Sequence, residues 1–253
     1  MVNEKIVITR PTSRTNDALK ILAEHDCVPI VVPTLELELF NSVSLQDLMG
    51  KLDSLDWLIF TSVSSLDSIF YFYPDFLERL SDNCKVGVIG HKTAKVCEDY
   101  GLSVDLVPRD YTAEGLLESF EHIDVNGLNI GIPRTFSARA VLPEGLRNMG
   151  ANVFLAESYK SVLPKDTGKI EDLVNCIMNG GVDAISFTSP LTVHNLFKVA
   201  DDVDGLVDSL NHDVLVVCIG PITFKALEKY GVNSIYPNVY TVQDMFDLLF
   251  KEL

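Results

Sequence analysis

The chain has 253 residues, of which 47% are hydrophobic and 22% charged, a composition typical of a globular protein. At about 150 residues per domain, this length predicts one large or two ordinary domains. Acidic residues outnumber basic ones by 36 to 20, for a net charge of −16. This balance argues against a general nucleic-acid-binding surface, which needs a basic face, but it does not exclude an anionic small molecule held by a few local donors.

No apolar run approaches the roughly 20 residues that cross a bilayer. The first residues lack the hydrophobic stretch of a signal peptide. The five cysteines are widely scattered and include no C-x-x-C pair, which indicates reduced thiols and no cysteine zinc site. We therefore expect a cytoplasmic protein without membrane association.

Short β-rich segments alternate with helical patterns along the whole chain. The spacing of Ile170, Leu173, Val174 and Ile177 places their side chains on one apolar helical stripe. Apolar strands separated by such helices predict parallel sheets that are covered on both faces. Strands are expected at residues 5–9, 28–32, 56–60, 85–89, 103–107, 129–133, 152–156, 184–188, 214–219 and 234–236.

The sequence also repeats itself weakly. Residues 56–62 resemble residues 183–189, and residues 88–93 resemble residues 218–223. The Ile-Thr-Arg segment ending at Arg10 similarly matches the Ile-Pro-Arg segment ending at Arg134. We interpret the repeat as two five-stranded α/β units of similar design.

An extended connection follows the second strand of each repeat, at residues 33–39 and 157–164. Leucine alternates with glutamate in the first, the period of a strand, and neither is rich in glycine and serine as a flexible tether would be. If the two connections pair as a hinge, the middle of the chain forms one domain and the two ends form the other. A sequential division near residue 127 is the alternative.

Small hydroxyl residues occur where predicted strands give way to helices. Helix N-capping is the ordinary explanation for each of them, and Pro190 and Pro221 support helix starts there. As a set they also indicate a ligand-binding site, because open α/β sheets bind ligands beyond the carboxyl ends of their strands, against helix N-termini. Two facing sheets would gather these residues around one cleft: Thr61, Ser62, Thr93, Thr188, Ser189 and Thr223.

Basic residues follow the same strand ends, although the chain is acidic overall. Ordinary solvated charge explains about half of them, but the arginine fork is also well suited to carboxylates. The dinucleotide, P-loop, nucleophile-elbow and H-E-x-x-H motifs are all missing from the sequence. The pattern favours a carboxylate ligand and no cofactor. The basic residues are Arg10, Arg14, Lys92, Arg109, Arg134, Arg139 and Lys160.

Taken in order, several segments resemble the uroporphyrinogen-III synthase family over nearly the whole chain. They are residues 6–11, 56–62, 88–94, 108–116, 158–159, 187–190 and 219–223. The resemblance implies an α/β fold of two similar parallel-sheet, flavodoxin-like domains joined by a two-stranded β hinge, as in HemD-like proteins. The implied domains are residues 1–35 with 163–253, and residues 41–157, with linkers at 36–40 and 158–162. It also implies a monomer that uses no cofactor and no metal.

The resemblance further implies a cyclising hydro-lyase of tetrapyrrole and heme biosynthesis. Its substrate, hydroxymethylbilane, is a linear tetrapyrrole with eight carboxylates that loses its terminal hydroxyl as an azafulvene forms. Ring D attacks through its substituted carbon, and a spiro intermediate recloses with that ring inverted to give uroporphyrinogen III. Unassisted closure gives the type I isomer instead.

By the same resemblance, Tyr159 matches the family's tyrosine that is proposed to assist departure of hydroxide. The carboxylates are expected to be held by Arg10, Ser62, Lys92, Thr93, Arg139, Ser189 and Thr223. The segment 63–65 departs from the family's usual continuation after the first Thr-Ser. The competing hypothesis is a non-catalytic, two-lobed protein that binds tetrapyrroles or regulates their use.

Overall fold

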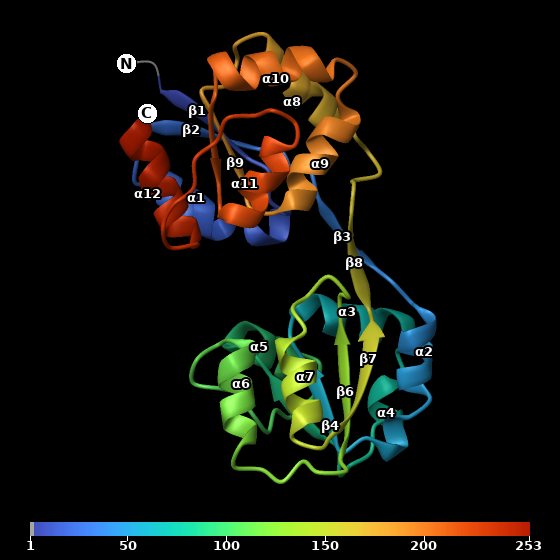
Figure 1. Cartoon of the computed structure of the whole chain (residues 1–253). Coiled ribbons are helices and arrows are strands. Elements are labelled where there is room, and N and C mark those ends of the chain that lie inside the picture. Colours follow the sequence, from blue (N-terminus) through green and yellow to red (C-terminus); the bar gives the residue numbers. More distant parts are fainter. Residues whose placement is uncertain (1–2) are drawn as a thin grey trace. The chain divides into compact units, whose positions relative to one another are not determined.

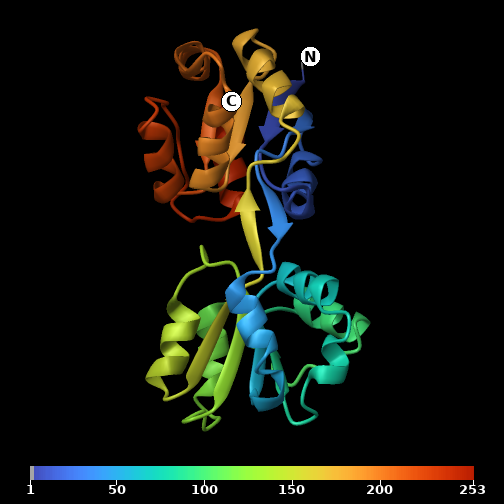
Figure 2. The ribbon, with the colours of Figure 1, turned by 90° about the vertical axis from the view of Figure 1, so that its right-hand side faces the viewer.

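A computed structural model of the protein describes residues 3–253, which divide into two compact units. Unit 1 contains the chain up to Glu36 together with Val162–Leu253, and unit 2 is Leu37–Ser161. The chain passes from one unit to the other within β3 (Glu36–Leu39) and β8 (Tyr159–Val162), which pair as a two-stranded sheet (Figures 1 and 2). The alternating leucines and glutamates therefore do form a strand.

The sheet of unit 1 has four parallel strands in the order β10-β9-β1-β2. The register of β1 with β2 runs from Glu4↔Cys27 to Ile8↔Val31. The central strand β9 is buried along its whole length, as its apolar sequence predicts. The strands are β1 (Glu4–Ile8), β2 (Cys27–Val31), β9 (Ala184–Phe187) and β10 (Leu215–Cys218).

Helices cover both faces of this sheet (Figure 1). The predicted stripe from Ile170 to Ile177 is confirmed: it lies in the core of one face, together with residues of α9, α10 and α11. On the other face, α1 and α12 pack over Ile6 and Ile8. The helices are η1 (Thr12–Arg14), α1 (Asn16–Leu22), α8 (Gly168–Met178), α9 (Pro190–Val199), α10 (Val203–His212), α11 (Pro221–Glu228) and α12 (Val242–Glu252).

Unit 2 repeats this architecture with four parallel strands in the order β5-β4-β6-β7. One face carries the core under α2 to α5, and the other carries the core under α6 and α7. The strands are β4 (Trp57–Phe60), β5 (Lys85–Val88), β6 (Asn129–Arg134) and β7 (Asn152–Glu157). The helices are α2 (Val43–Met49), η2 (Leu52–Ser54), α3 (Val63–Phe72), α4 (Phe76–Arg79), α5 (His91–Asp99), α6 (Ala113–Phe120) and α7 (Val141–Asn148).

The two sheets have the same spatial order of strands, but the chain begins each sheet at a different position in that order. In the sheets, β6 and β7 take the places of β1 and β2, while β4 and β5 take those of β9 and β10. Each unit thus has the flavodoxin-like order, with the switch point beside β1 or β6. The predicted fold class of two similar parallel-sheet units is confirmed.

The expected fifth strand of each unit is wrong. Residues 103–107 and 234–236 each make a single bridge, Leu106 to Gly87 and Ile235 to Val217. Pro108 and Pro237 follow these segments and have no N–H to continue a ladder. In unit 2 the Asp105 carboxylate also accepts the Val86 N–H at 2.8 Å, in place of a backbone partner.

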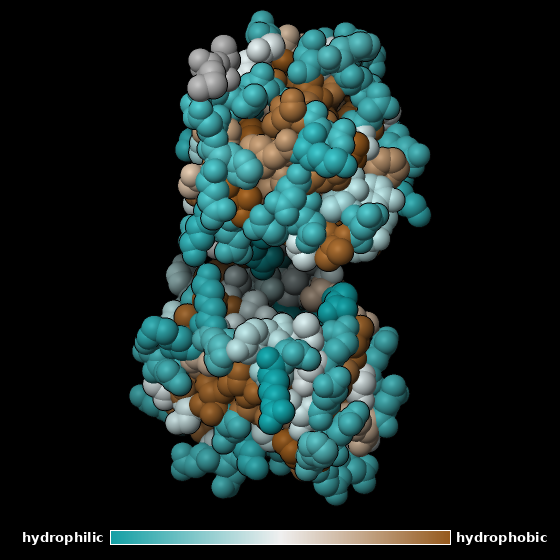
Figure 3. Space-filling model, turned by 90° about the vertical axis from the view of Figure 1, so that its left-hand side faces the viewer, coloured by the Kyte–Doolittle hydropathy of each residue, from teal (hydrophilic) through white to brown (hydrophobic). Residues whose placement is uncertain are grey.

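The surface shown in Figure 3 is largely hydrophilic, with separate hydrophobic areas on both units. Large exposed apolar side chains such as Tyr71, Ile222 and Val239 come from different elements of the chain. Among residues 3–253, none of the helices combines the length and the apolar character that a membrane crossing requires.

Candidate functional site

Within each unit, the residues predicted to bind carboxylates follow the carboxyl ends of parallel strands. Because such ends meet at one edge of a sheet, the fold brings these residues to the same edge of their own unit. Unit 1 contributes Arg10 after β1, Ser189 after β9 and Thr223 after β10. Unit 2 contributes Ser62 after β4, Lys92 and Thr93 after β5, Arg139 after β6 and Tyr159 after β7.

The helix starts at these edges differ in how their N–H groups are satisfied. Ser189 caps α9 by accepting the Thr192 N–H at 3.3 Å, so the capping interpretation is confirmed there. In contrast, α5 and α11 begin after glycines and have no side-chain cap. Thr93 and Thr223 lie buried in the first turns of these helices, and neither hydroxyl has a hydrogen-bond partner among the side chains that the structure describes. These two first turns therefore offer free donors.

Ser62 occupies the N-cap position of α3 but does not cap the helix. Its hydroxyl donates to Tyr159 Oη at 3.1 Å and lies 3.4 Å from Ser65 Oγ. The Ser65 hydroxyl in turn donates to the Ser62 carbonyl oxygen at 2.7 Å. The three hydroxyls form one connected cluster within unit 2, and Tyr159 is only 5% exposed.

A buried cation lies beside this cluster. Arg134, at the end of β6, is 4% exposed, and its Nε and Nη2 donate to the carbonyl oxygens of Thr135 (3.1 Å) and Arg139 (2.8 Å). Burial lowers the pKa of the Arg134 guanidinium, and the electrostatic interaction with Tyr159 opposes that effect. Sequence reasoning placed Arg134 among the basic residues near strand ends but did not select it for the site. Its match to Arg10 in the repeat was the available signal.

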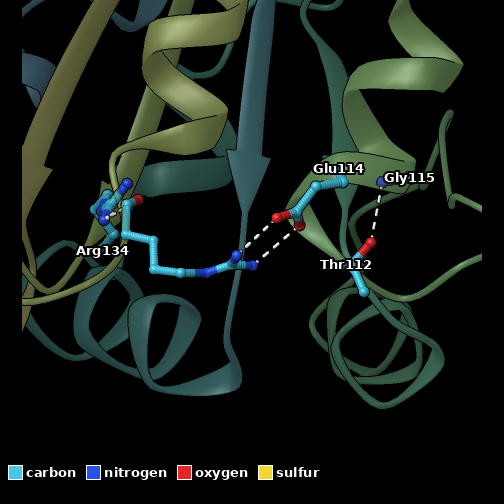
Figure 4. Close-up of polar contacts among 5 residues, drawn as sticks. Thr112, Glu114, Gly115 and Arg134 are labelled. Atoms are coloured by element: carbon cyan, nitrogen blue, oxygen red, sulfur yellow. Dashed lines mark hydrogen bonds and ion pairs between the residues drawn. The ribbon is translucent and has the colours of Figure 1, made fainter. Parts of the chain in front are cut away.

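Arg139 already holds a carboxylate, that of Glu114. Its two terminal nitrogens lie 2.6 and 3.0 Å from the Glu114 oxygens, both side chains being well exposed (Figure 4). Hydrogen bonding from Arg139 lowers the pKa of the Glu114 carboxyl group. Thr112 fixes the start of the helix that carries Glu114 by accepting the Gly115 N–H at 3.0 Å. The pair shows that this guanidinium accommodates a bidentate carboxylate.

The uroporphyrinogen-III synthase HemD family matches residues 16–247 of the chain. A Methanothermobacter thermautotrophicus protein, provisionally named a uroporphyrinogen-III synthase, is 43% identical over 96% of both chains. The chain belongs to this family. The uroporphyrinogen-III synthase of Chlorobaculum parvum is 25% identical over 90% of both chains.

Solved structures of uroporphyrinogen-III synthases share the fold. The Helicobacter pylori protein covers all of both chains with a TM-score of 0.62 at 14% identity. A mutant of the Thermus thermophilus protein covers 98% of both chains with a TM-score of 0.55 at 19% identity. The predicted resemblance is therefore confirmed, and the non-catalytic alternative is not favoured.

Two cationic residues at the strand ends are available to an anionic ligand, Arg10 in unit 1 and Lys92 in unit 2. Arg10 is partly buried, and its buried Nη1 has no hydrogen-bond partner among the described residues. Burial lowers the pKa of its guanidinium, while the Asp17 carboxylate opposes this. Lys92 is exposed at the start of α5.

Within residues 3–253, no three His, Cys, Asp or Glu side chains converge as a metal site requires.

Proposed function

We propose that the protein is a uroporphyrinogen-III synthase, which cyclises hydroxymethylbilane with loss of water and inversion of ring D. Family membership and the 43% identical relative support the activity. The observation that carries the proposal in this chain is the Tyr159 phenol, held by Ser62 at the carboxyl ends of the strands of unit 2. A phenol can donate a proton, and until it does so it is neutral and places no fixed negative charge beside eight carboxylates.

The proposed binding groups suit a polycarboxylate. Arg10, Lys92 and Arg139 supply charge, while hydroxyls and helix N–H groups at Thr93, Ser189 and Thr223 supply neutral donors. The Arg139–Glu114 pair supports this, because it is the same contact made to a carboxylate of the chain itself. With a net charge of −16, the attraction for an anion has to be local.

In the proposed reaction, the substrate C–O bond breaks and its electron pair stays on the departing oxygen, which takes the Tyr159 proton and leaves as water. Ring D then attacks the resulting azafulvene through its substituted carbon, and the spiro intermediate recloses with this ring inverted. Holding one folded conformation of a flexible chain contributes much of the rate enhancement, since positioning alone is worth several kcal/mol. Without that hold the unsubstituted position reacts and type I forms.

We also propose that the two units act as domains, residues 1–35 with 163–253 and residues 41–157, on linkers 36–40 and 158–162. The exchange of the chain between the units inside β3 and β8 supports these boundaries. The protein is proposed to act as a cytoplasmic monomer on this small molecule, without cofactor, metal, nucleic acid or membrane.

The decisive experiment supplies freshly prepared hydroxymethylbilane to the purified protein and oxidises the products. Chromatography then resolves type I from type III uroporphyrin. We expect type III to dominate with the native protein and type I to dominate with buffer or heat-denatured protein. Equal isomer ratios in the native and denatured samples would reject the proposed activity.

Replacing Glu114 with glutamine is expected to lower KM for hydroxymethylbilane. The native carboxylate competes with substrate for Arg139, and because an exposed pair of this kind is weak, KM should fall by no more than about 5-fold. Steady-state assays at low and high salt measure the effect, which should shrink as salt screens the pair. In an Arg139→Ala background the same substitution should change nothing. A higher KM for Glu114→Gln would mean that the pair organises the site instead.

A further inference from the structure

The orientation of the Ser62 hydroxyl is not dictated by the backbone. Ser62 has φ −159° and ψ 155°, and its repeat equivalent Ser189 has φ −160° and ψ 155°. The third helical residue also behaves alike in both units, since Ser65 and Thr192 each donate to the preceding N-cap carbonyl oxygen at 2.7 Å. Only the N-cap hydroxyl differs: Ser189 caps its helix, whereas Ser62 donates to Tyr159.

This difference has a cost, because an N-cap hydrogen bond ordinarily stabilises a helix. In unit 2 that bond is absent and the hydroxyl is directed to the phenol instead. A helix start that forgoes its cap for a single tyrosine indicates a role for that tyrosine's oxygen, beyond the packing of its ring.

The directions of the hydrogen bonds decide which proton is free. The Ser65 proton is committed to the Ser62 carbonyl oxygen, and the Ser62 proton to Tyr159 Oη. Tyr159 is therefore an acceptor within the cluster, and its own phenolic proton is not used there. Should the phenol lose that proton, the donor from Ser62 and the buried charge of Arg134 are already in place.

We propose that Ser62 is a positioning residue for Tyr159, whose hydroxyl orients the phenol and stabilises the phenolate formed on proton transfer. This inference rests on the proposed function, in which the phenolic O–H bond breaks and the proton passes to the leaving hydroxyl oxygen. The proton released as the macrocycle closes restores the phenol. Ser62 thus acts through Tyr159 and does not bind a substrate carboxylate.

The test is a double-mutant cycle of Ser62→Ala and Tyr159→Phe, in which the rate of type III formation is measured for each variant. Ser62→Ala should lower kcat by about 10- to 100-fold, the value of a hydrogen bond to a charged group, with KM nearly unchanged. In the Tyr159→Phe background it should cause no further loss. The Ser62→Thr variant keeps the hydroxyl and should recover most of kcat. Ser189→Ala is the matched control, and its effect should combine independently with that of Tyr159→Phe.

A second readout does not require activity. The fluorine resonance of 3-fluorotyrosine placed at position 159 should move in Ser62→Ala and stay in place in Ser189→Ala. Three outcomes would each overturn the role of Ser62. The effects of Ser62→Ala and Tyr159→Phe could be independent, Ser62→Ala could raise KM alone, or the fluorine resonance could stay in place in Ser62→Ala. A fully active Tyr159→Phe variant would instead refute the proposed acid, and a native protein without type III product would refute the proposed function.

Discussion

Replacing Tyr159 with phenylalanine is expected to slow formation of the type III isomer by about 100-fold, the lower end of what a general acid contributes. The lower end is expected because positioning supplies much of the rate enhancement in this reaction. The ring and its packing are kept, so the variant should fold. It loses one hydrogen bond, from Ser62, and stability should change by no more than about 1 kcal/mol. Unconverted substrate would close spontaneously, and the ratio of type III to type I should fall.

The matched control is Tyr73→Phe. Tyr73 also lies in unit 2 and also loses one side-chain hydrogen bond, which its hydroxyl donates to Asn41 Oδ1 at 2.8 Å. It takes no part in the proposed reaction, so both rate and isomer ratio should match the native protein. Rate and isomer ratio are measured together over a time course. If Tyr159→Phe behaves like the control, Tyr159 is a packing residue and another hydroxyl or a water molecule supplies the proton.

The fold could be predicted from the sequence because its signals are local. The stripe on α8 and the apolar run of β9 are visible within a dozen residues, and both are buried as expected. The repeat added which strands correspond to each other. The fifth strands failed because one proline after each segment outweighs a β-rich composition, and the partner of Asp105 cannot be inferred from its neighbours in sequence.

The sequence allowed candidate site residues to be selected, but it did not reveal the contacts that these residues make. Ser62 and Ser189 both end a Phe-Thr-Ser segment, so local rules assign capping to both. The difference arises from Tyr159, which lies 97 residues from Ser62 in the chain. Similarly, Arg139 is paired with Glu114, 25 residues away. Arg10 and Arg134 match in the repeat, yet Arg134 donates to two main-chain oxygens, whereas Arg10 has a buried nitrogen with no partner in the described part of the chain.

Arg134→Met is expected to destabilise unit 2 by about 2 kcal/mol. The two charge-assisted bonds to Thr135 and Arg139 are worth about 1.5–3 kcal/mol each, and their loss leaves two carbonyl oxygens unpaired. Two factors reduce the net cost. Burial of the guanidinium is itself unfavourable, as its lowered pKa shows, and methionine removes that penalty. The exposed Arg139 also allows water to reach at least one of the released carbonyls.

The single tryptophan makes this change measurable in the unit concerned. Trp57 is 3% exposed in β4, so its fluorescence in urea follows the unfolding of unit 2. The urea midpoint of Arg134→Met should fall with an unchanged slope, which separates lost stability from a change in the unfolded state.

Arg79→Met is the control, because Arg79 also donates to a main-chain oxygen, that of Met49, but from a side chain that is 39% exposed. Arg134→Lys should recover little stability, since a single ammonium group does not reproduce the two-pronged contact of the guanidinium. Arg134 also fixes the backbone that presents Arg139, so Arg134→Met should raise KM for hydroxymethylbilane as well as lower the midpoint. A lower midpoint with the native KM would show that Arg134 contributes to folding only, because Arg139 would then be positioned correctly without it.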